Sequence, residues 1–584
     1  MKKKKVGLII GIAVILAAAI LAAIIIICKK NTVTLEEKSA KISLSDNGTT
    51  YEGTGVTVDG DKITITNPGD YEVSGALSDG RLVIDVPSGT VNVTLNGASI
   101  TNEDMDAIYS KDTADVNIIV ADGTQNTLVS GSEGFEVEES ELDEDGSIKN
   151  KQKSAIYVKG NLEITGAGTL DVTGYINNGI QAKGTLSIAD ATITINAQNH
   201  GIKSGDEMNL LSGNFNIVSA EDGFQSDLNI TISDGTYQIE AGDDGVHADG
   251  ELTIDNGTIT ITKSNEGLEG HIVTINDGEI DITSSDDGIN ANGGSASGFG
   301  MGGDMNKQDF SGEAPAMSED SSSEESSSEE ESKVDTTTTP ELTINGGTIH
   351  VNAEGDGLDS NGNMTFNGGE VYVDGPSNGG NSALDYGTEC GGILTINGGT
   401  VVAVGMSDML EAVDGTSKQE SIMFVFSSKV NKGTEVKVTD STGKEIISFT
   451  PVKDADSVIL SCPELEQGET YTFAYGDSSE AITATEINAT NYTGKGMGGG
   501  MGGGMSSGNE MPNAGTMPED GTMPEDGTMP GDGTMPNDGT MPEEGERPER
   551  GDFQKGQKPG DMGDTTETTE QDGDSASTDK ENSL

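Results

Sequence analysis

The chain has 584 residues and a formal net charge of −68, because 100 acidic side chains outnumber 32 lysines and arginines. This excess of negative charge excludes nucleic acid and anionic lipid surfaces as direct electrostatic partners. Three cysteines are too few for a disulfide scaffold, and although Cys390 and Cys462 could pair, nothing in the sequence requires it.

The first segment, residues 1–32, resembles a membrane-targeting sequence. Four lysines precede an apolar run over residues 6–27, which is long enough to cross a bilayer and places the amino terminus inside. We expect an uncleaved N-terminal helix in the membrane, with a cleaved signal as the alternative. Both possibilities place the remaining chain outside the membrane. An uncleaved helix would hold it on the outer face of the cell membrane or cell surface, and a cleaved signal would give a secreted protein.

Residues 33–416 contain a repeat that opens with an acid, a glycine and an apolar residue. From Ile202 to Phe224, Val246 and Leu268, the apolar position advances by 22 residues each time. A fixed period of this size indicates a solenoid, in which equivalent positions of neighbouring turns stack in space.

Within each repeat, apolar residues alternate with polar ones in short runs that end at Gly or Asn/Asp, as in Leu252–Ile254 and Ile259–Ile261. This pattern predicts three short strands per turn. A second turn carries glycines such as Gly235 and Gly257, where a sharp corner needs a positive φ. We therefore predict an all-β chain: a right-handed parallel β-helix of roughly eleven turns.

Two acidic insertions, at about residues 131–153 and 293–339, interrupt the repeats. Residues 417–480 alternate polar and apolar positions and predict a small β-rich cap over the open end. Residues 481–584 are Gly/Met runs and Thr-Met-Pro-Glu-Asp-Gly repeats, which predict a disordered acidic tail.

The acids of the repeats are predicted to form columns. At roughly 5 Å spacing, each neighbouring pair of carboxylates costs about 3 kcal/mol at an effective dielectric near 20. Ca²⁺ would offset this repulsion, because it takes six to eight oxygen ligands. We predict Ca²⁺ as the cofactor, with the metal-site candidates Asp222, Asp243, Asp244, Glu266, Asp286, Asp287, Asp356, Asp359 and Asp385. The alternative is that Asp-Gly is turn chemistry alone, with the acids pointing into water.

Five further side chains lie beside the acids in the repeat and are candidates for ligand contact. They are His247, Glu269, Asn290, Lys203 and Lys263. A column of Gln225, His247, Glu269, Asn290, Asp359 and Asp385 is expected from their equal offsets within the repeat.

The combination resembles the bacterial cell-surface carbohydrate-binding β-helix proteins of clostridial type, related in fold to pectate lyases. The matching features are Gly69–Gly75, Leu95–Ile100, the Asp-Gly-apolar repeats and Ser461–Tyr471. The resemblance implies a right-handed β-helix, calcium sites on one face and binding of acidic or plant-type polysaccharide. Asp222 followed by Asp243 and Asp244 is similar to the calcium ligands of such lyases, but His247 stands where a carboxylate is expected.

We expect a monomeric, surface-displayed protein that binds a pectin-like or other plant-type polysaccharide through Ca²⁺. One alternative is a calcium-dependent lyase, in which Lys203 or Lys263 would remove a proton by β-elimination. Another is a structural surface rod or adhesin without a glycan ligand.

Overall fold

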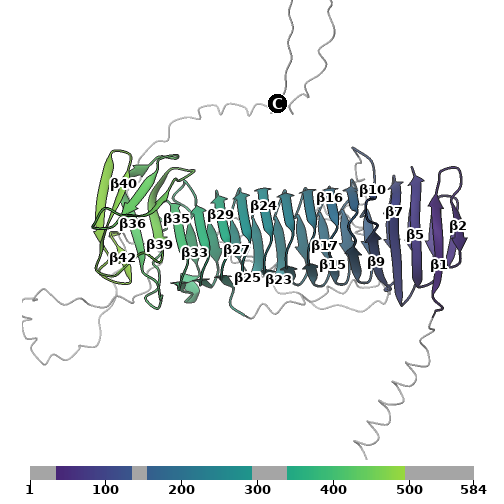
Figure 1. The fold of residues 1–584 in the computed structure, drawn as a ribbon, viewed down its shortest axis with the longest axis horizontal. Helices are drawn as coiled ribbons and strands as arrows, with labels where there is room; N and C mark the ends of the chain where they lie inside the picture. Colours follow the sequence, from purple (N-terminus) through teal and green to yellow (C-terminus); the bar gives the residue numbers. More distant parts are fainter. Residues whose placement is uncertain (1–34, 135–153, 293–337, 494–584) are drawn as a thin grey trace, which may run out of the picture. The chain divides into compact units, whose positions relative to one another are not determined.

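A computed structural model describes residues 35–134, 154–292 and 338–493 (Figure 1). The expected anchor, both insertions except their edges, and most of the predicted tail lie outside these residues. Among the described residues, no helix is long and apolar enough to cross a membrane. The described chain is all-β, apart from the short 3-10 segment η2 (Thr388–Cys390).

Nearly all strands belong to one long, mostly parallel sheet of 38 strands. In Figure 1 the strands of successive repeats lie side by side along the stack. Each strand pairs with its equivalent in the next repeat, as the period predicts and as a β-helix requires. At the N-terminal end, β1 and β2 pair antiparallel, as do β3 and β4. The bounds here are β1 (Lys38–Leu44), β2 (Thr50–Gly53), β3 (Val56–Asp59), β4 (Lys62–Ile65) and β5 (Gly69–Leu77).

The first ladder of parallel strands begins directly after the acid-Gly pairs and carries the candidate site. Its members are β6 (Arg81–Ile84), β8 (Ile108–Ser110), β11 (Ile156–Val158), β14 (Ile180–Ala182), β17 (Ile202–Ser204), β20 (Phe224–Ser226), β23 (Val246–Ile254), β25 (Leu268–Ile275), β27 (Ile289–Ala291), β30 (Leu358–Ser360) and β33 (Leu384–Tyr386).

The second ladder follows the first along each repeat, and β23 and β25 are long enough to take part in both. Its other members are β7 (Thr90–Asn102), β9 (Asp115–Val120), β12 (Leu162–Thr165), β15 (Leu186–Ile188), β18 (Met208–Leu210), β21 (Ile230–Ile232), β28 (Glu341–Ile344), β31 (Asn363–Phe366) and β34 (Leu394–Ile396).

The third ladder completes the repeat. It comprises β10 (Gln125–Ser130), β13 (Thr169–Gly174), β16 (Thr192–Ala197), β19 (Asn214–Ser219), β22 (Thr236–Glu240), β24 (Thr258–Lys263), β26 (Glu279–Ser284), β29 (Thr348–Ala353), β32 (Glu370–Asp374) and β35 (Thr400–Gly405).

The parallel stack changes at β35, which pairs antiparallel with β39. A separate four-stranded sheet, called here the C-terminal sheet, follows in the order β38-β37-β40-β41. The bounds are β36 (Ser421–Val430), β37 (Val436–Thr439), β38 (Glu445–Phe449), β39 (Ala455–Ser461), β40 (Thr470–Tyr475), β41 (Ser478–Thr483) and β42 (Asn488–Thr490). Cys390 is exposed and Cys462 is buried, and both are free thiols.

The alternating residues of all three ladders point into one apolar core. Ile202, Ile230 and Ile259 come from the three ladders, and each is fully buried. Burial of such a side chain contributes about 1.5–3 kcal/mol. The ring of Phe215 stacks on that of Tyr237, with centroids 4.8 Å apart. The core therefore fixes which residues point outward, and with them the outer columns.

The turn between the second and third ladders is stabilised by stacked amides. Asn276 donates to Asp255 at 2.8 Å, Asn345 to Asn276 at 2.9 Å, and Asn367 to Asn345 at 2.9 Å. The series, called here the amide ladder, extends to Asn397, which donates to Asn367 at 3.0 Å. The glycines after these positions have positive φ, as predicted, for example Gly257 at 121° and Gly278 at 123°.

Candidate functional site

The middle position of the first ladder forms a single outward column, and its register is the predicted one. Its chemistry changes along the stack, from aromatic through amide and amine to acid. The register partners are, in order, Tyr109, Tyr157, Gln181, Lys203, Gln225, His247, Glu269, Asn290, Asp359 and Asp385.

A second stack, called here the turn column, lies where each repeat enters the first ladder. Asp222, Asp244, Glu266, Asp287 and Asp356 precede the glycine there, and their main-chain carbonyls accept bonds from glycine amides of the preceding repeat, as Asp244 does from Gly223 at 2.8 Å. A Cβ on Gly223 would lie 2.6 Å from the Gly245 carbonyl oxygen and 2.8 Å from Ile239. The glycine of the acid-Gly motif is therefore required by close packing between turns.

Some carboxylates of the turn column have a structural role. Asp222 Oδ1 accepts the Asp244 amide at 3.1 Å, and Asp287 Oδ1 accepts the Asp356 amide at 2.6 Å. Asp356 likewise accepts the amide of Ser382. These bonds hold one repeat to the next, so turn chemistry accounts for part of the acid pattern.

Two histidines lie beside the carboxylates at one end of the acid stack. His247 Nδ1 lies 3.0 Å from Asp244 Oδ2 and 2.9 Å from Glu269 Oε2, and His200 Nδ1 lies 3.2 Å from Asp222 Oδ2. Burial opposes protonation of His247, but its hydrogen bonds to three acids raise its pKa far above the usual value. The imidazolium occupies the position where a lyase-like carboxylate was expected. We call these residues the histidine end.

Among the described residues, Glu266, Asp287, Asp356 and Asp359 make no ion pair with a histidine. Burial raises the pKa of Glu266 to about 8, of Asp356 to about 8 and of Asp359 to about 9, and the neighbouring carboxylates add to each shift. Burial also raises the pKa of Asp287 to about 6. These four acids, with Asp385 and Asn290, form the acid end. Their charges are poorly tolerated without a counter-ion.

Two observations make the junction of these ends suitable for a cation. Carboxylate oxygens of Asp244, Glu266 and Glu269 lie within 4.8 Å of one another, which is the span of two opposed Ca²⁺–oxygen bonds of about 2.4 Å. Beside them, Asn290 is 3 % exposed and its Nδ2 donates to Glu266 at 2.9 Å, while its buried Oδ1 has no hydrogen-bond partner in the part of the chain that the structure describes. An all-oxygen set with a spare acceptor fits a hard cation.

Four of the predicted site residues do not join the buried acids of the stack. The side chains of Asp243 and Asp286 are exposed. Lys203 Nζ lies 3.3 Å from Asp227, and Lys263 Nζ, on the third ladder, lies 3.9 Å from Glu240. A lyase would need an amine free to accept a proton, and both amines already face a carboxylate.

The aromatic end of the column contains a feature that the sequence analysis did not find. Arg81 Nη2 contacts Asp106 at 3.0 Å, and its guanidinium lies 5.0 Å from the centre of the Tyr109 ring. The Tyr109 and Tyr157 rings stack with centroids 5.8 Å apart. Arg81 precedes the clear 22-residue repeats, so the repeat pattern gives no signal for it.

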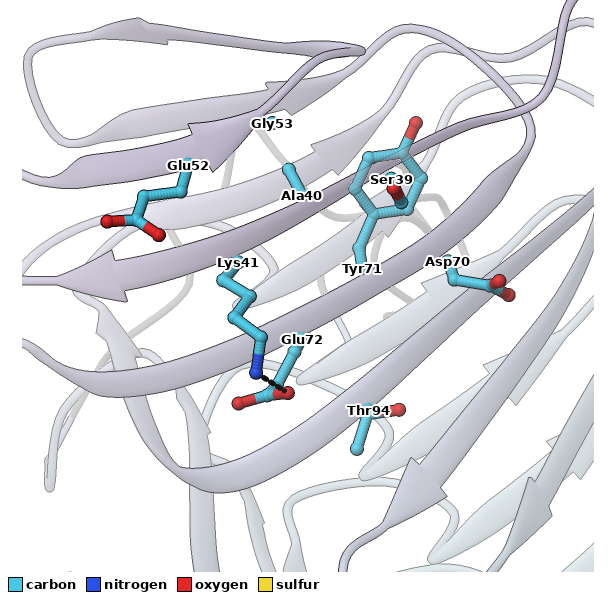
Figure 2. Close-up of a pocket in the computed structure, with 9 residues that line it drawn as sticks. All are labelled: Ser39, Ala40, Lys41, Glu52, Gly53, Asp70, Tyr71, Glu72 and Thr94. Atoms are coloured by element: carbon cyan, nitrogen blue, oxygen red, sulfur yellow. Dashed lines mark hydrogen bonds and ion pairs between the residues drawn. The ribbon is translucent and has the colours of Figure 1, made fainter.

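A separate hollow of about 520 Å³ lies at the N-terminal end, among β1, β2, β5 and β7 (Figure 2). Its lysine, Lys41, pairs with Glu72 at 2.7 Å, and the Tyr71 hydroxyl donates to the Asn67 carbonyl. These polar groups satisfy one another rather than converging on an open position, so the first ladder remains the better candidate site.

A family model and two known proteins are similar to this chain. The model of the family described as carbohydrate-binding domain-containing proteins matches residues 59–303 and 263–381, which together span more than half of the chain. The chain belongs to this family. The matched residues include the whole first ladder except β33, and both ends of the acid stack apart from Asp385.

A curated carbohydrate-binding domain-containing protein from Acetivibrio thermocellus is 34 % identical over 144 residues, which are 24 % of this chain and 48 % of the relative. A solved structure, titled as the polysaccharide lyase-like protein from C. thermocellum in a gadolinium derivative, is 22 % identical. It covers 61 % of this chain and 96 % of its own, with a TM-score of 0.28. A score this low does not by itself establish a shared fold.

Proposed function

We propose that this protein binds an acidic, pectin-like polysaccharide through Ca²⁺ held at the junction of the histidine and acid ends. The observation that carries the proposal is the convergence of Asp244, Glu266 and Glu269 beside the unpartnered Asn290 oxygen. Family membership supports a carbohydrate as the ligand.

Charge explains why an ion is needed. A chain with a net charge of −68 repels a polyuronate at long range. A bound Ca²⁺ would supply a positive centre that accepts both protein and sugar carboxylates. Asp244, Glu266 and Glu269 would hold the ion, and Asn290 would offer a neutral oxygen.

The remaining column would orient the sugar chain. Gln181, Lys203 and Gln225 follow one another in register away from the acids. Strands at roughly 4.8 Å spacing present these groups as a continuous row. Gln181 and Gln225 are buried, whereas the Lys203 side chain is about one-fifth exposed. Lys203 is therefore the member of this row that would hydrogen-bond to a hydroxyl or carboxylate oxygen of a sugar chain lying along the stack.

We further propose that the protein acts as a monomer on the outer cell surface, with residues 1–32 as its membrane anchor. The apolar run after four lysines supports this location. A protein displayed in this way would hold the cell against an acidic polysaccharide without requiring a reaction.

The test is calorimetric Ca²⁺ titration of the full chain, followed by binding to immobilised polygalacturonate with Ca²⁺ or EGTA. We expect Ca²⁺ to bind and EGTA to abolish retention. Glu266→Gln with Glu269→Gln should weaken Ca²⁺ binding about 100-fold, because two of the charged ligands are lost. Glu251→Gln is the matched control, since Glu251 is exposed on β23, the strand that carries His247.

Three outcomes would separate the hypotheses. Retention that persists in EGTA would overturn the calcium bridge. Release of unsaturated uronate product would instead identify a lyase. A chain that takes up Ca²⁺ but is not retained by any glycan would indicate a structural rod or adhesin.

A further inference from the structure

A groove on the third ladder lies away from the acid stack and has different chemistry. It has a volume of about 610 Å³, and its lining includes Thr260, Asp281, His350, Asn352, Tyr372 and Val452. Thr260, Asp281, His350 and Tyr372 are consecutive register partners on β24, β26, β29 and β32. The groove therefore crosses four strands at one outward position.

Two stacked rings form the most distinctive part of this groove. The His350 and Tyr372 rings lie nearly parallel, 8° apart, with centroids separated by 5.1 Å. This separation matches the strand spacing, so the rings stand across the ladder and one face of the imidazole covers the tyrosine. Its other face is directed toward position 281, where Asp281 is shorter than a ring. A flat, open surface beside a carboxylate results.

The C-terminal part of the chain fixes the pair from the other side. Tyr372 packs against the apolar cluster beneath the C-terminal sheet. The Val452 amide donates to Asp374 Oδ1 at 2.8 Å, and its side chain, 53 % exposed, lines the groove. Because Tyr372 is held in place, a ligand that stacks on the pair pays little ordering entropy.

The polar groups of the groove suit hydroxyl ligands. Asp281 is an exposed acceptor, and the buried Asn352 Oδ1 has no partner among the described residues. Glu279, Asp281 and Asp374 make the lining acidic, which disfavours a uronate. A neutral sugar offers hydroxyl donors to these acceptors and a C–H face to the ring, whose face is electron-rich.

We propose that this groove is a second carbohydrate subsite, which takes the ring of a neutral hexopyranose without a metal. The sugar stacks on the free face of His350, Asp281 accepts one of its hydroxyl groups, and Val452 forms an apolar wall. The inference shares with the proposed function only the premise that the ligand is a polysaccharide. It gives one molecule two modes of glycan recognition, one that requires calcium and one that does not.

The experiment measures binding of the full chain to soluble neutral polysaccharides (a β-glucan, a galactan and a mannan) by affinity electrophoresis in EGTA. We expect at least one of them to retard the protein. His350→Ala should weaken that binding about tenfold, in line with the loss of one aromatic contact. Asn216→Ala is the matched control, because Asn216 is exposed in the same outer column on β19.

A second measurement protects the test from folding artefacts. The chain has four histidines, so the His350 ring signals can be assigned in proton spectra by comparison with the variant. They should shift on titration with the retained glycan, while Ca²⁺ titration of His350→Ala stays unchanged. Lack of retardation by all three glycans, or full binding by His350→Ala, would overturn the subsite. Loss of Ca²⁺ binding in Glu266→Gln with Glu269→Gln would leave this subsite intact, so the two proposals can fail separately.

Discussion

The amide ladder and the turn column are both polar stacks of the same repeat, yet they have opposite energetics. In the amide ladder every asparagine from Asn276 to Asn397 donates to the residue one repeat earlier. An amide carries both donor and acceptor, so its copies satisfy one another. Ionised carboxylates only accept, and their copies repel. The difference indicates that the amide ladder stabilises the stack, whereas the acids need something from outside it.

The largest effect that follows is a pH dependence of the calcium-free protein. Glu266, Asp356 and Asp359 have folded pKa values of about 8, 8 and 9, raised by burial from unfolded values of about 4. Their stabilising contribution is complete below the unfolded pKa and is lost as pH rises through the folded one. Each group can contribute a slope of up to about 1.4 kcal/mol per pH unit.

We therefore expect the free energy of unfolding in EGTA to fall steadily between about pH 5 and pH 8. Urea titrations at several pH values measure it. Saturating Ca²⁺ should flatten the dependence, because the ion neutralises the acids. Stability that rises with pH in EGTA would show that the acids are solvated.

The next largest effect is expected at the histidine end. His247→Gln removes the cation between Asp244 and Glu269, and loss of one partner from a buried ionic group costs about 3–5 kcal/mol. Thermal unfolding in EGTA should show the loss, and Ca²⁺ should restore much of it. His350→Gln, on the exposed face of the third ladder, should change stability by less than about 0.5 kcal/mol.

A smaller effect of opposite sign is expected at the acid end. Asp359→Asn replaces an acid that burial keeps protonated at neutral pH, so it should stabilise the calcium-free fold by about 1–2 kcal/mol. The same change should weaken Ca²⁺ binding about tenfold, because the ion would favour ionisation of Asp359, which an amide cannot undergo. Chemical denaturation measures the change in stability and calorimetry measures the change in Ca²⁺ affinity. The control Glu251→Gln should alter neither quantity.

The smallest effect on stability is expected when one asparagine of the amide ladder is replaced by aspartate. Asn367→Asp removes the donor to Asn345 and should cost about 1 kcal/mol of stability. Asp255→Asn, at the start of the ladder, keeps the acceptor for Asn276 and should be nearly neutral. Equal effects of the two changes on the urea midpoint would mean that the amide bonds do not hold the turns together.

The stacking of the repeats can be predicted from the amino-acid pattern. Its 22-residue period and alternating apolar residues fix which strands pair and which side chains point inward, since a shift of one residue would expose the core. The register of His247, Glu269, Asn290 and Asp359 follows directly from this. The glycines that follow the amide ladder were predictable for the same reason, because only local geometry is involved.

The pairing of the charged side chains, in contrast, follows from contacts that the repeat pattern does not contain. Equal offsets could not show that His247 and His200 lie against carboxylates at one end, that Asp243 and Asp286 face solvent, or that Asn290 Oδ1 has no hydrogen-bond partner within the described ranges. Nor could they place Tyr372 against the C-terminal cluster. Periodicity fixes where each residue stands in its strand. Which side chains form ion pairs and hydrogen bonds depends on their rotamers, their burial and contacts between segments far apart in sequence.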